Sequence, residues 1–528
     1  MQPAAAALPD SLAIASEIRL RIPGLDTLRG LIPIGLAYDG KHLLVAEAGI
    51  NAVGVIDPAS GEIKGHIPAG WFPTRIALSD DAVYVTNAKG HGIGPNATVD
   101  GPMPQSFLAD RRRGSLSRYT MPSDDELPRL TQQVFSNNGF SPAGAAPAIP
   151  AAIDHVVIIV KENRTFAEVF GDIAGAPKLA RFGAKVTPNH HALADRFSRS
   201  DNFYADSEVS VDGHHWLVGS YPNEWTESTL MAAYGGAKKF ALTPESPGRL
   251  EFPGSNSSVH PEDQLEAGTL WHHLERHKIP FRNYGEGFEL AGVNEGKGLK
   301  PTGARLLTNV PMPEPLYLNT ARDYPNFNMN IPDQYRADQF IHDIDARYVK
   351  PGHPLPRFIF IHLPQDHMAD ARPEDGYPTR AAFVADNDLA LGRIVDYLSH
   401  TRAWPHMAIF VTEDDAQGGV DPVDAHRTVF LAISPYAKPG CVAQTNTSFT
   451  SLLKTTFQIL HLPPLNLFDA TSANLAECFT QSADLRPYTA QPADKSVFDP
   501  ALVREPLDPK PSPKMDDPRE LKRDHKSK

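Results

Sequence analysis

The stretch IDHVVIIVKENRTF, residues 153–166, decides the fold of this chain. Its centre, HVVIIV at 155–160, is a short and continuously apolar run, which is typical of a strand buried on both faces of a parallel sheet. Polar and charged side chains follow at once in Glu162, Asn163 and Arg164. In a doubly wound sheet, reactive groups gather at the carboxyl ends of the strands. The stretch therefore predicts a central strand that ends in a functional site.

Three further apolar runs have the same character as residues 155–160. They are FIFIHL at 358–363, MAIFVT at 407–412 and VFLAIS at 429–434. Helical patterns accompany them: residues 381–400 place apolar side chains near one face, and residues 451–462 do the same until a Pro-Pro pair stops the helix. Strands that alternate with helices predict an α/β fold with a doubly wound sheet, which we assign to residues 151–485.

The region before this domain has an all-β pattern. Residues 32–49, IPIGLAYDGKHLLVAEAG, and residues 72–90, FPTRIALSDDAVYVTNAKG, share the order of a Pro, an apolar run, an Asp turn and an apolar strand. They start about 40 residues apart, which is the period of a propeller blade. Both resemble the YVTN family of β-propeller repeats, and the letters YVTN stand at 84–87. We expect residues 1–96 to form a partial β-propeller of two or three blades; the alternative is a small β-meander cap.

Two other segments have the composition of irregular structure. Residues 97–150 are rich in Gly, Pro, Ser and Ala, which predicts a linker, and GSLSRYTM at 114–121 leaves one further strand open within it. Residues 486–528 are polar, Pro-rich and charged, which predicts a disordered polar tail.

Composition and charge exclude several classes of protein. The 50 Lys and Arg residues against 63 Asp and Glu residues give a net charge of −13, so we expect no nucleic-acid partner. No apolar run reaches the roughly 18 residues of a membrane helix, so we expect no transmembrane segment. The first residues also show no signal-peptide pattern. The only two cysteines, Cys441 and Cys478, exclude a Cys-based metal cluster and leave the question of one disulfide open.

Acidic and imidazole side chains follow three of the four apolar runs. The runs lead into Glu162-Asn163, into Asp366-His367 and into Glu413-Asp414-Asp415. Each motif alone would also fit a helix N-cap. The carboxyl ends of parallel strands open on one edge of a sheet, however, and carboxylates that meet there repel one another without a cation. The coincidence of three motifs therefore predicts a site for a divalent cation.

The segment DNFYADSEVSVDGHHWLVGSYPNEW, residues 201–225, places hydroxyls close to imidazoles. Ser207 and Ser210 precede His214 and His215 by a few residues. A hydroxyl nucleophile beside a cation suits in-line attack on a phosphate ester. The alternative is a polar loop anchored by an aromatic side chain.

Many ordered motifs of this chain together resemble one family. They are IDHVVIIVKENRTFAEVFGD, DNFYADSEVS with DGHHW, LPQDH, VADNDLALGRIV, TEDDAQGG, DAHRTVFLAISPYAKPG and LLKTTFQILHLPPL, spread over about residues 150–475. The chain resembles the bacterial phosphoesterase family that holds acid phosphatases and non-zinc phospholipases C, within the alkaline-phosphatase-like superfamily. The resemblance implies an alkaline-phosphatase-like fold and a metal-dependent hydrolase of phosphate esters with a Ser nucleophile.

The resemblance also implies roles for individual residues. Glu162, Asn163, Asp414 and Asp415 match the metal ligands; Asn163, Arg164 and His214 match phosphate-binding positions; Ser210 matches the nucleophile, with Ser207 in reserve; His367 and His426 match catalytic positions. Carboxylate and amide ligands suit Ca²⁺, Mg²⁺ or Mn²⁺, whereas histidine ligands favour Zn²⁺ or Fe. The implied substrate is a small-molecule or lipid phosphate ester, and relatives of this type are usually periplasmic or secreted.

One departure from the family pattern leaves an alternative open. Relatives are expected to carry an Asp-His pair shortly after the EDDAQ motif, where this chain has Asp421-Pro422. A proline neither binds a metal nor donates a proton, so either His426 takes over or the protein is a weakly active or inactive scaffold that binds partners through its β-repeats. Sulfatase chemistry on the same scaffold is disfavoured, because no C/S-x-P-x-R context lies near the first strand of the α/β domain.

Overall fold

The structure is a computed structural model that describes residues 17–80, 82–100, 113–140, 148–224, 226–227, 268–286, 314–325, 327, 329, 331–416 and 419–503. The chain divides into two compact units. One unit comprises residues 1–91 with 114–141, and the other comprises residues 92–113 with 142–528.

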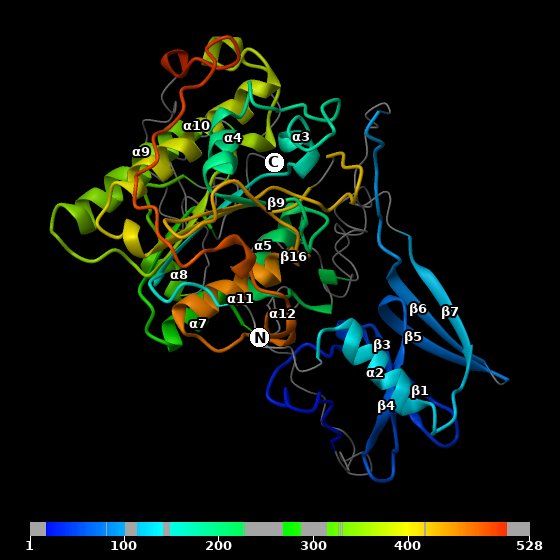
Figure 1. Ribbon diagram of the computed structural model, residues 1–528. Coiled ribbons are helices and arrows are strands. Elements are labelled where there is room, and N and C mark those ends of the chain that lie inside the picture. Colours follow the sequence, from blue (N-terminus) through cyan, green and yellow to red (C-terminus); the bar gives the residue numbers. More distant parts are fainter. Residues whose placement is uncertain are drawn as a thin grey trace, which may run out of the picture. The chain divides into compact units, whose positions relative to one another are not determined.

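The larger unit is built on a seven-stranded mixed sheet (Figure 1). In spatial order its strands are β11 (Phe281–Tyr284), β12 (Phe358–His362), β8 (His155–Lys161), β13 (Met407–Glu413), β14 (Phe430–Ile433), β9 (Ser198–Ser200) and β15 (Cys441–Ala443). The first four are parallel, whereas β14 is antiparallel to both of its neighbours. The four predicted apolar runs are therefore all strands, and the three that precede acidic motifs point the same way.

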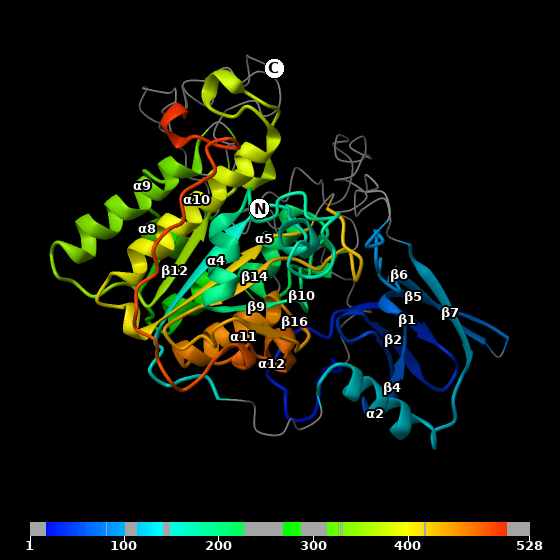
Figure 2. The same cartoon turned by 45° about the horizontal axis from the view of Figure 1, so that its top comes forward.

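Helices cover both faces of this sheet, which explains why its central strands are apolar at every position. Figures 1 and 2 show α4 (Pro188–Arg196), α9 (Asp333–Ile344) and α10 (Arg380–Ser399) on one side, and α11 (Phe449–Leu460) with α12 (Leu467–Thr471) on the other. Val157 and Ile159 of β8 share a core with the first group of helices. Burial on both faces is what a continuous Val and Ile run requires.

The remaining elements of the larger unit are short. They are α3 (Phe166–Phe170), α5 (Ser210–Gly219), α7 (Leu270–Arg276), α8 (Glu314–Asn319), a two-stranded sheet of β10 (Phe203–Tyr204) and β16 (Thr447–Ser448), a π-helix at Asp345–Val349, and 3₁₀ turns at Gln365–His367, Pro373–Asp375, Trp404–His406, Ala476–Cys478 and Pro500–Leu502. Within the described ranges, none of the helices combines the length and the apolar character that crossing a membrane requires. Cys441 and Cys478 are both free thiols.

The smaller unit contains two antiparallel sheets. One is β1 (Pro33–Tyr38), β2 (Leu43–Glu47), β3 (Ala52–Ile56) and β4 (Ile63–Pro68) in chain order; the other is β5 (Trp71–Ser79), β6 (Ala82–Gly90) and β7 (Ser115–Thr120). A 3₁₀ turn at Ala48–Ile50 and helix α2 (Leu127–Asn137) complete the unit. The all-β pattern is thus present as antiparallel sheets that share one apolar core.

Parts of the two segments that were predicted to be irregular are ordered. Strand β7 is the strand that the linker prediction left open. Helix α2 was missed. Its buried residues Leu127 and Val134 lie in a stretch of mostly polar residues, so no clear apolar pattern marks it. In the predicted tail, Tyr488 and Phe498 are buried, so residues 486–503 are packed against the larger unit. Residues 504–528 of that tail, and residues 101–112 and 141–147 of the predicted linker, lie outside the described residues.

Candidate active site

Four neighbouring parallel strands end at the candidate site. Strand β8 is followed by Glu162 and Asn163, and β13 by Asp414 and Asp415. His362 is the last residue of β12, which pairs with β8 on its other side. Asn163 has φ +65°, a conformation that Asn tolerates better than most residues, and this turn follows directly on the strand. The topology therefore brings together side chains from distant parts of the sequence, as predicted.

Helix α5 carries the candidate nucleophile to the same edge. Ser210 is its first residue, and the carboxylate of Asp212 accepts hydrogen bonds from the backbone N–H groups of Glu208 and Val209, which fixes the turn into the helix. Gly213 allows a close approach, because a Cβ atom there would lie 2.1 Å from the carbonyl oxygen of Asp414. The helix is thereby held against the loop that follows β13.

Five oxygen-bearing side chains, that of Ser210 among them, meet at this edge of the sheet. Ser210 Oγ lies 2.9 Å from Asp415 Oδ2, 3.1 Å from Asn163 Oδ1 and 3.3 Å from Glu162 Oε2. The backbone N–H of Asn163 lies 3.3 Å from Asp414 Oδ1, which brings the fifth side chain into the group. We call Glu162, Asn163, Ser210, Asp414 and Asp415 the oxygen cluster. All five residues are buried.

The amide of Asn163 tests whether this donor set fits a cation. As placed, its oxygen faces only acceptors; with the amide rotated, the nitrogen would lie 3.1 Å from Glu162 Oε2 and 3.2 Å from Asp414 Oδ1. Two arrangements satisfy these contacts. Either the rotated amide donates hydrogen bonds, or the oxygen stays and a cation lies among the oxygens. An all-oxygen set of carboxylates, an amide and a hydroxyl is what Mg²⁺, Ca²⁺ and Mn²⁺ prefer, so the residues fit the cation.

The charges of the oxygen cluster also favour a cation. Burial, together with the negative charges of Glu162 and Asp415, raises the pKa of Asp414 well above its ordinary value. Burial acts on Glu162 in the same sense, but hydrogen bonds with His214 and His362 outweigh it and lower the pKa of that carboxyl. Carboxylates that compete in this way are stabilised by a positive charge among them.

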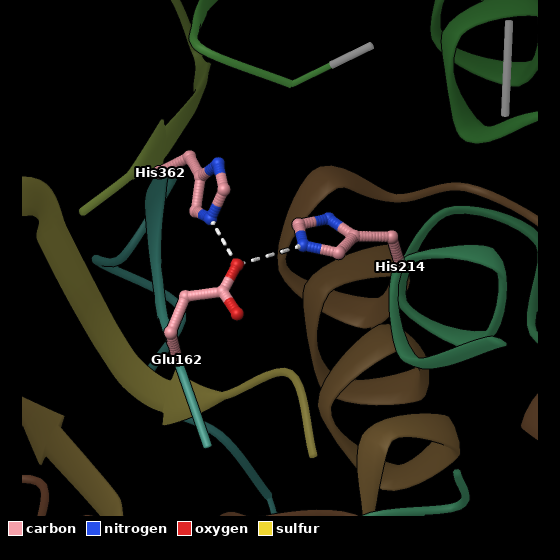
Figure 3. Close-up of side chains that lie close together, drawn as sticks. All are labelled: Glu162, His214 and His362. Atoms are coloured by element: carbon pink, nitrogen blue, oxygen red, sulfur yellow. Dashed lines mark hydrogen bonds and ion pairs between the residues drawn. The ribbon is translucent and has the colours of Figure 1, made fainter. Parts of the chain in front are cut away.

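Two imidazoles lie close to the carboxylate of Glu162 (Figure 3). His362 Nε2 is 2.9 Å and His214 Nε2 is 3.7 Å from Glu162 Oε1. The Nδ1 atom of His214 lies 2.7 Å from Oε2 of Glu286, a buried residue just after β11. Potential ligand atoms of Glu162, His214 and His362 all lie within 4.8 Å of one another, so these three residues could also hold a metal ion.

A buried ion-pair network of Lys161, Asp366 and Glu413 contacts the backbone of the candidate site. Lys161 Nζ donates to Asp366 Oδ2 and to Glu413 Oε1, both at 2.7 Å. Burial disfavours the ammonium, but the two carboxylates outweigh it and raise the pKa of Lys161. Asp366 Oδ1 in turn accepts the backbone N–H of Glu162 at 3.0 Å. The predicted Asp366 thus fixes the backbone at the end of β8.

Three residues that the sequence assigned to the site are held by other partners. The Arg164 guanidinium lies 3.9 Å from Glu168 and stacks over the Phe182 ring. The His367 ring packs edge-on against Phe327, with a centroid distance of 5.2 Å. His426 has its Nδ1 2.9 Å from Asp424 Oδ1 and its Nε2 3.6 Å from Glu208 Oε1. The reserve nucleophile, Ser207, donates its hydroxyl to the carbonyl of Asp414 at 2.8 Å.

Sequence reasoning missed His362 and Glu286. His362 was counted as part of the apolar run 358–363, although a polar residue at a strand end was the very signal used for Glu162. Glu286 follows the strand predicted from FRNYGEG and gives the same signal. Examining the polar residues at the carboxyl end of each of the four parallel strands would have found both residues.

A mixed α/β sheet that gathers buried carboxylates, a serine hydroxyl and imidazoles at the carboxyl ends of its parallel strands is the arrangement expected of a hydrolase. The chain belongs to the Phosphoesterase family, whose sequence profile matches residues 177–463, more than half of the chain. Membership in this family supports an enzyme that hydrolyses esters. Glu162 and Asn163 lie before the matched range.

The chain is also similar to solved structures. A protein of the alkaline phosphatase superfamily from Vibrio parahaemolyticus shares 13% identity with a TM-score of 0.37, over 64% of this chain and 71% of that one. The lipoteichoic acid synthase LtaP from Listeria monocytogenes shares 10% identity with a TM-score of 0.40, over 65% of this chain and 82% of that one. No curated protein sequence matches this chain.

Proposed function

We propose that this protein is a metal-dependent hydrolase of phosphate esters in which Ser210 is the nucleophile. The observation that carries the proposal is the position of Ser210 Oγ, within 2.9–3.3 Å of oxygens from Asp415, Asn163 and Glu162. A hydroxyl placed among buried acceptors is a poor structural solution, since two carboxylates and an amide oxygen compete for one proton. It is a good solution for a nucleophile that shares a cation with those groups.

The chain's own residues divide the work of the reaction. Glu162, Asn163, Asp414 and Asp415 would hold the cation, which neutralises charge on the phosphate and favours the ionised form of Ser210. Ser210 Oγ attacks phosphorus in line, the bond to the leaving oxygen breaks, and water later hydrolyses the phosphoserine. The position of Ser210 at the N-terminus of α5 places the helix dipole where it stabilises negative charge.

We assign proton transfer and phosphate orientation to the imidazoles and to Arg164. His426, whose Nδ1 is held by Asp424, would protonate the leaving oxygen, because its Nε2 lies near Glu208, two residues before the nucleophile. His367 is the second candidate for this role. Asn163, Arg164 and His214 remain the proposed phosphate-binding residues.

The departure at Asp421-Pro422 fits a structural role for Asp421. Both of its carboxylate oxygens accept a hydrogen bond from Arg427 Nε at 3.0 Å. One of them also accepts the backbone N–H of Ala167 at 3.2 Å. A carboxylate engaged in this way secures the loop that leads to His426. This arrangement supports the view that His426 takes over the missing function and that the protein is active.

For the smaller unit we propose a partial propeller of YVTN-like repeats. The four-stranded sheet β1–β4 has antiparallel strands in chain order, as a propeller blade has, and the β5–β7 sheet has the strand count of an incomplete blade. Family resemblance supports a periplasmic or secreted enzyme that acts on a small-molecule or lipid phosphate ester.

Turnover of aryl phosphates tests the proposal. Protein stripped with a chelator is assayed on mono- and diesters after addition of Mg²⁺, Ca²⁺, Mn²⁺ or Zn²⁺. We expect one of these cations to restore turnover, and we expect Ser210→Ala to lower kcat/KM by at least about 10³-fold. Ser207→Ala is the matched control and should change kcat/KM by less than about tenfold. Absence of restorable turnover would favour the inactive scaffold.

A further inference from the structure

We propose that Cys441 and Cys478 form a disulfide when the folded protein meets a disulfide oxidant. The structure holds both residues as thiols, and they are the only two cysteines of the chain. Only one intramolecular pairing is therefore open to them. The proposal concerns a covalent modification of the larger unit and does not depend on the proposed function.

Backbone hydrogen bonds bring the two chain segments together just before Cys441. The N–H of Lys438 donates to the carbonyl oxygen of Cys478 at 2.9 Å, and the N–H of Cys441 donates to the carbonyl oxygen of Lys438 at 3.3 Å. Ser198, which pairs with Cys441 in the sheet, has its Oγ 2.7 Å from the carbonyl oxygen of Cys478 and 2.9 Å from that of Lys438. The turn that leads to Cys441 is thereby held against the backbone of Cys478.

The side chain of Glu477 ties the same segments together just after Cys441. Its carboxylate accepts the backbone N–H groups of Gln444 at 3.1 Å and of Thr445 at 2.8 Å. The hydroxyl of Thr445 donates to the same carboxylate at 2.6 Å. Cys441 therefore lies between two places where its segment is fixed to the segment of Cys478.

The thiol of Cys441 points to the partner segment. It donates a weak hydrogen bond to the carbonyl oxygen of Glu477 at 3.9 Å, and this carbonyl belongs to the peptide bond that leads into Cys478. Burial raises the pKa of the Cys478 thiol, and the nearby Cys441 thiol adds to the rise. A disulfide requires neighbouring backbones, and here rotation of the two side chains suffices to bring the sulfur atoms together.

The two thiols differ in exposure, which sets the order of the reaction. Cys441 is partly exposed, whereas Cys478 is buried. The thiolate of Cys441 attacks one sulfur of the oxidant's disulfide, that S–S bond breaks, and half of the oxidant leaves as a thiolate. Cys478 then loses its proton, attacks the sulfur of Cys441 and releases the second half. The two cysteines together give up two electrons and two protons, and the oxidant is reduced to two thiols.

A shared metal ion is the other use of two neighbouring cysteines. A structural zinc site needs four ligands, of which the two thiolates supply half. Among the residues that the structure describes, no group of three His, Cys, Asp or Glu side chains that could hold a metal includes either cysteine. The surroundings of Cys441 and Cys478 therefore favour a disulfide.

The disulfide would close a loop that packs beside the segment leading to the proposed nucleophile. Residues 442–477 lie within this loop and include β16, α11 and α12. Strand β16 pairs with β10, and the N–H of Thr450 in α11 donates to Asp206 Oδ2 at 3.3 Å. Both β10 and Asp206 lie shortly before Ser210. Because a cross-link over a long loop restricts the unfolded chain, the disulfide should stabilise the fold around the candidate site.

Peptide mapping of the oxidised protein tests the pairing. Folded full-length protein is incubated with oxidised glutathione, alkylated with iodoacetamide in denaturant and digested with trypsin. We expect residues 428–454 to be linked to residues 455–495, with neither cysteine alkylated. In Cys478→Ala, Cys441 should instead carry one glutathione, because no second thiol displaces it. Cys441→Ser should give neither product.

The melting temperature measures the consequence of the pairing. We expect the oxidised parent to melt at least about 3 °C above the reduced parent. Cys441→Ser is the matched control and should melt at the same temperature with and without oxidant, while circular dichroism confirms that it is folded. The proposal is overturned if the treated parent carries glutathione on Cys441 without the linked peptides, or if both of its cysteines are alkylated.

Discussion

Lys161 is the residue on which the candidate site most depends for its shape. Its ammonium is buried and balances the two carboxylates of Asp366 and Glu413. Asp366 then positions the backbone of Glu162, and Glu413 Oε2 accepts the backbone N–H of Arg164 at 3.2 Å. One cation thereby organises the loop that follows β8.

Replacing Lys161 by Met should destabilise the larger unit by about 3–5 kcal/mol. Met has nearly the same volume but leaves two buried carboxylates uncompensated, which costs more than the ion pair gains. Urea denaturation followed by tryptophan fluorescence measures the change.

An exposed lysine provides the control for this substitution. Lys350→Met removes an ion pair with Asp345 at 3.7 Å, in which the lysine is 70% exposed. Such surface pairs contribute about 0–1 kcal/mol. If both variants lost the same small amount, Lys161 would not have the structural role that its contacts indicate.

At this scale the sequence predicted much of the site. Glu162, Asn163, Asp414 and Asp415 follow strands, and Ser210 was placed by its motif, so these five residues meet as expected. His362 was missed because it stands at the end of an apolar run, and Glu286 was missed because the polar residues after the strand of FRNYGEG were not counted with those after the other strands. Which way Arg164, His367 and His426 turn depends on packing that no local pattern encodes.

Helix α12 shows how the caps of short elements contribute to stability. The side chain of its N-cap, Asn466, accepts the backbone N–H of Phe468 at 2.9 Å. Asp469 accepts the backbone N–H groups of Asn466 at 2.8 Å and of Leu465 at 3.0 Å. Burial nevertheless raises the pKa of Asp469 to about 6, because it disfavours the charge more than these bonds support it.

Asp469 should therefore reduce stability as the pH rises. Its pKa is about 6 in the folded chain against 3.8 for the ordinary side chain, so the folded chain holds the extra proton between these values. Stability contributed by this proton is complete below about pH 4 and is lost as the pH passes 6, a cost of about 3 kcal/mol. Asp469→Asn removes the titration and keeps one acceptor. The melting temperature of the variant relative to the parent should therefore increase from pH 4 to pH 7.

Asp494 provides a control in which the pH dependence of stability should have the opposite sign. Hydrogen bonds from Ser496 lower the pKa of this surface carboxyl, so its charged form is the one that folding favours. Asp494→Asn should lose stability relative to the parent as the pH rises. A pH profile that is the same for both variants would show that burial does not control Asp469.

Elements with strong patterns were predicted and those with mixed patterns were not. The four apolar runs are strands because a sheet covered on both faces requires apolar residues at every position. That β14 runs antiparallel to β13 could not be predicted, since a buried strand has the same composition in either direction. Helix α2 was missed because only one narrow face of it enters the core.

At the scale of the whole molecule, each of the two units has its own apolar core. The core of the larger unit extends to a C-terminal segment that its composition assigned to a disordered tail. Tyr488 donates its hydroxyl to Asn189 Oδ1 at 2.9 Å, and Phe498 stacks on Tyr377 with a centroid distance of 5.8 Å. A few buried aromatic residues are therefore enough to hold this largely polar segment against α4 and α10.

Removing the chain after residue 485 should therefore destabilise the larger unit. The truncation exposes the places of Tyr488 and Phe498, which are 2% and 0% exposed, and burial of such side chains contributes about 1.5–3 kcal/mol each. It also removes the hydrogen bond from the Ala490 N–H to Asp396 Oδ2 on α10 at 2.8 Å. We expect a loss of at least about 3 kcal/mol in urea denaturation, measured against the full chain.

Two point variants in the same segment test whether the loss of stability on truncation comes from the packing of Phe498 or from the length of chain removed. Phe498→Ala should reproduce most of the loss, because Phe498 lies against Tyr377 and Phe383 in an apolar cluster and leaves a cavity there. Leu502→Ala should change little, since that side chain is 65% exposed. If the truncated chain and Phe498→Ala were both as stable as the full chain, the segment would be a passive extension, and the boundary of the larger unit would return to residue 485.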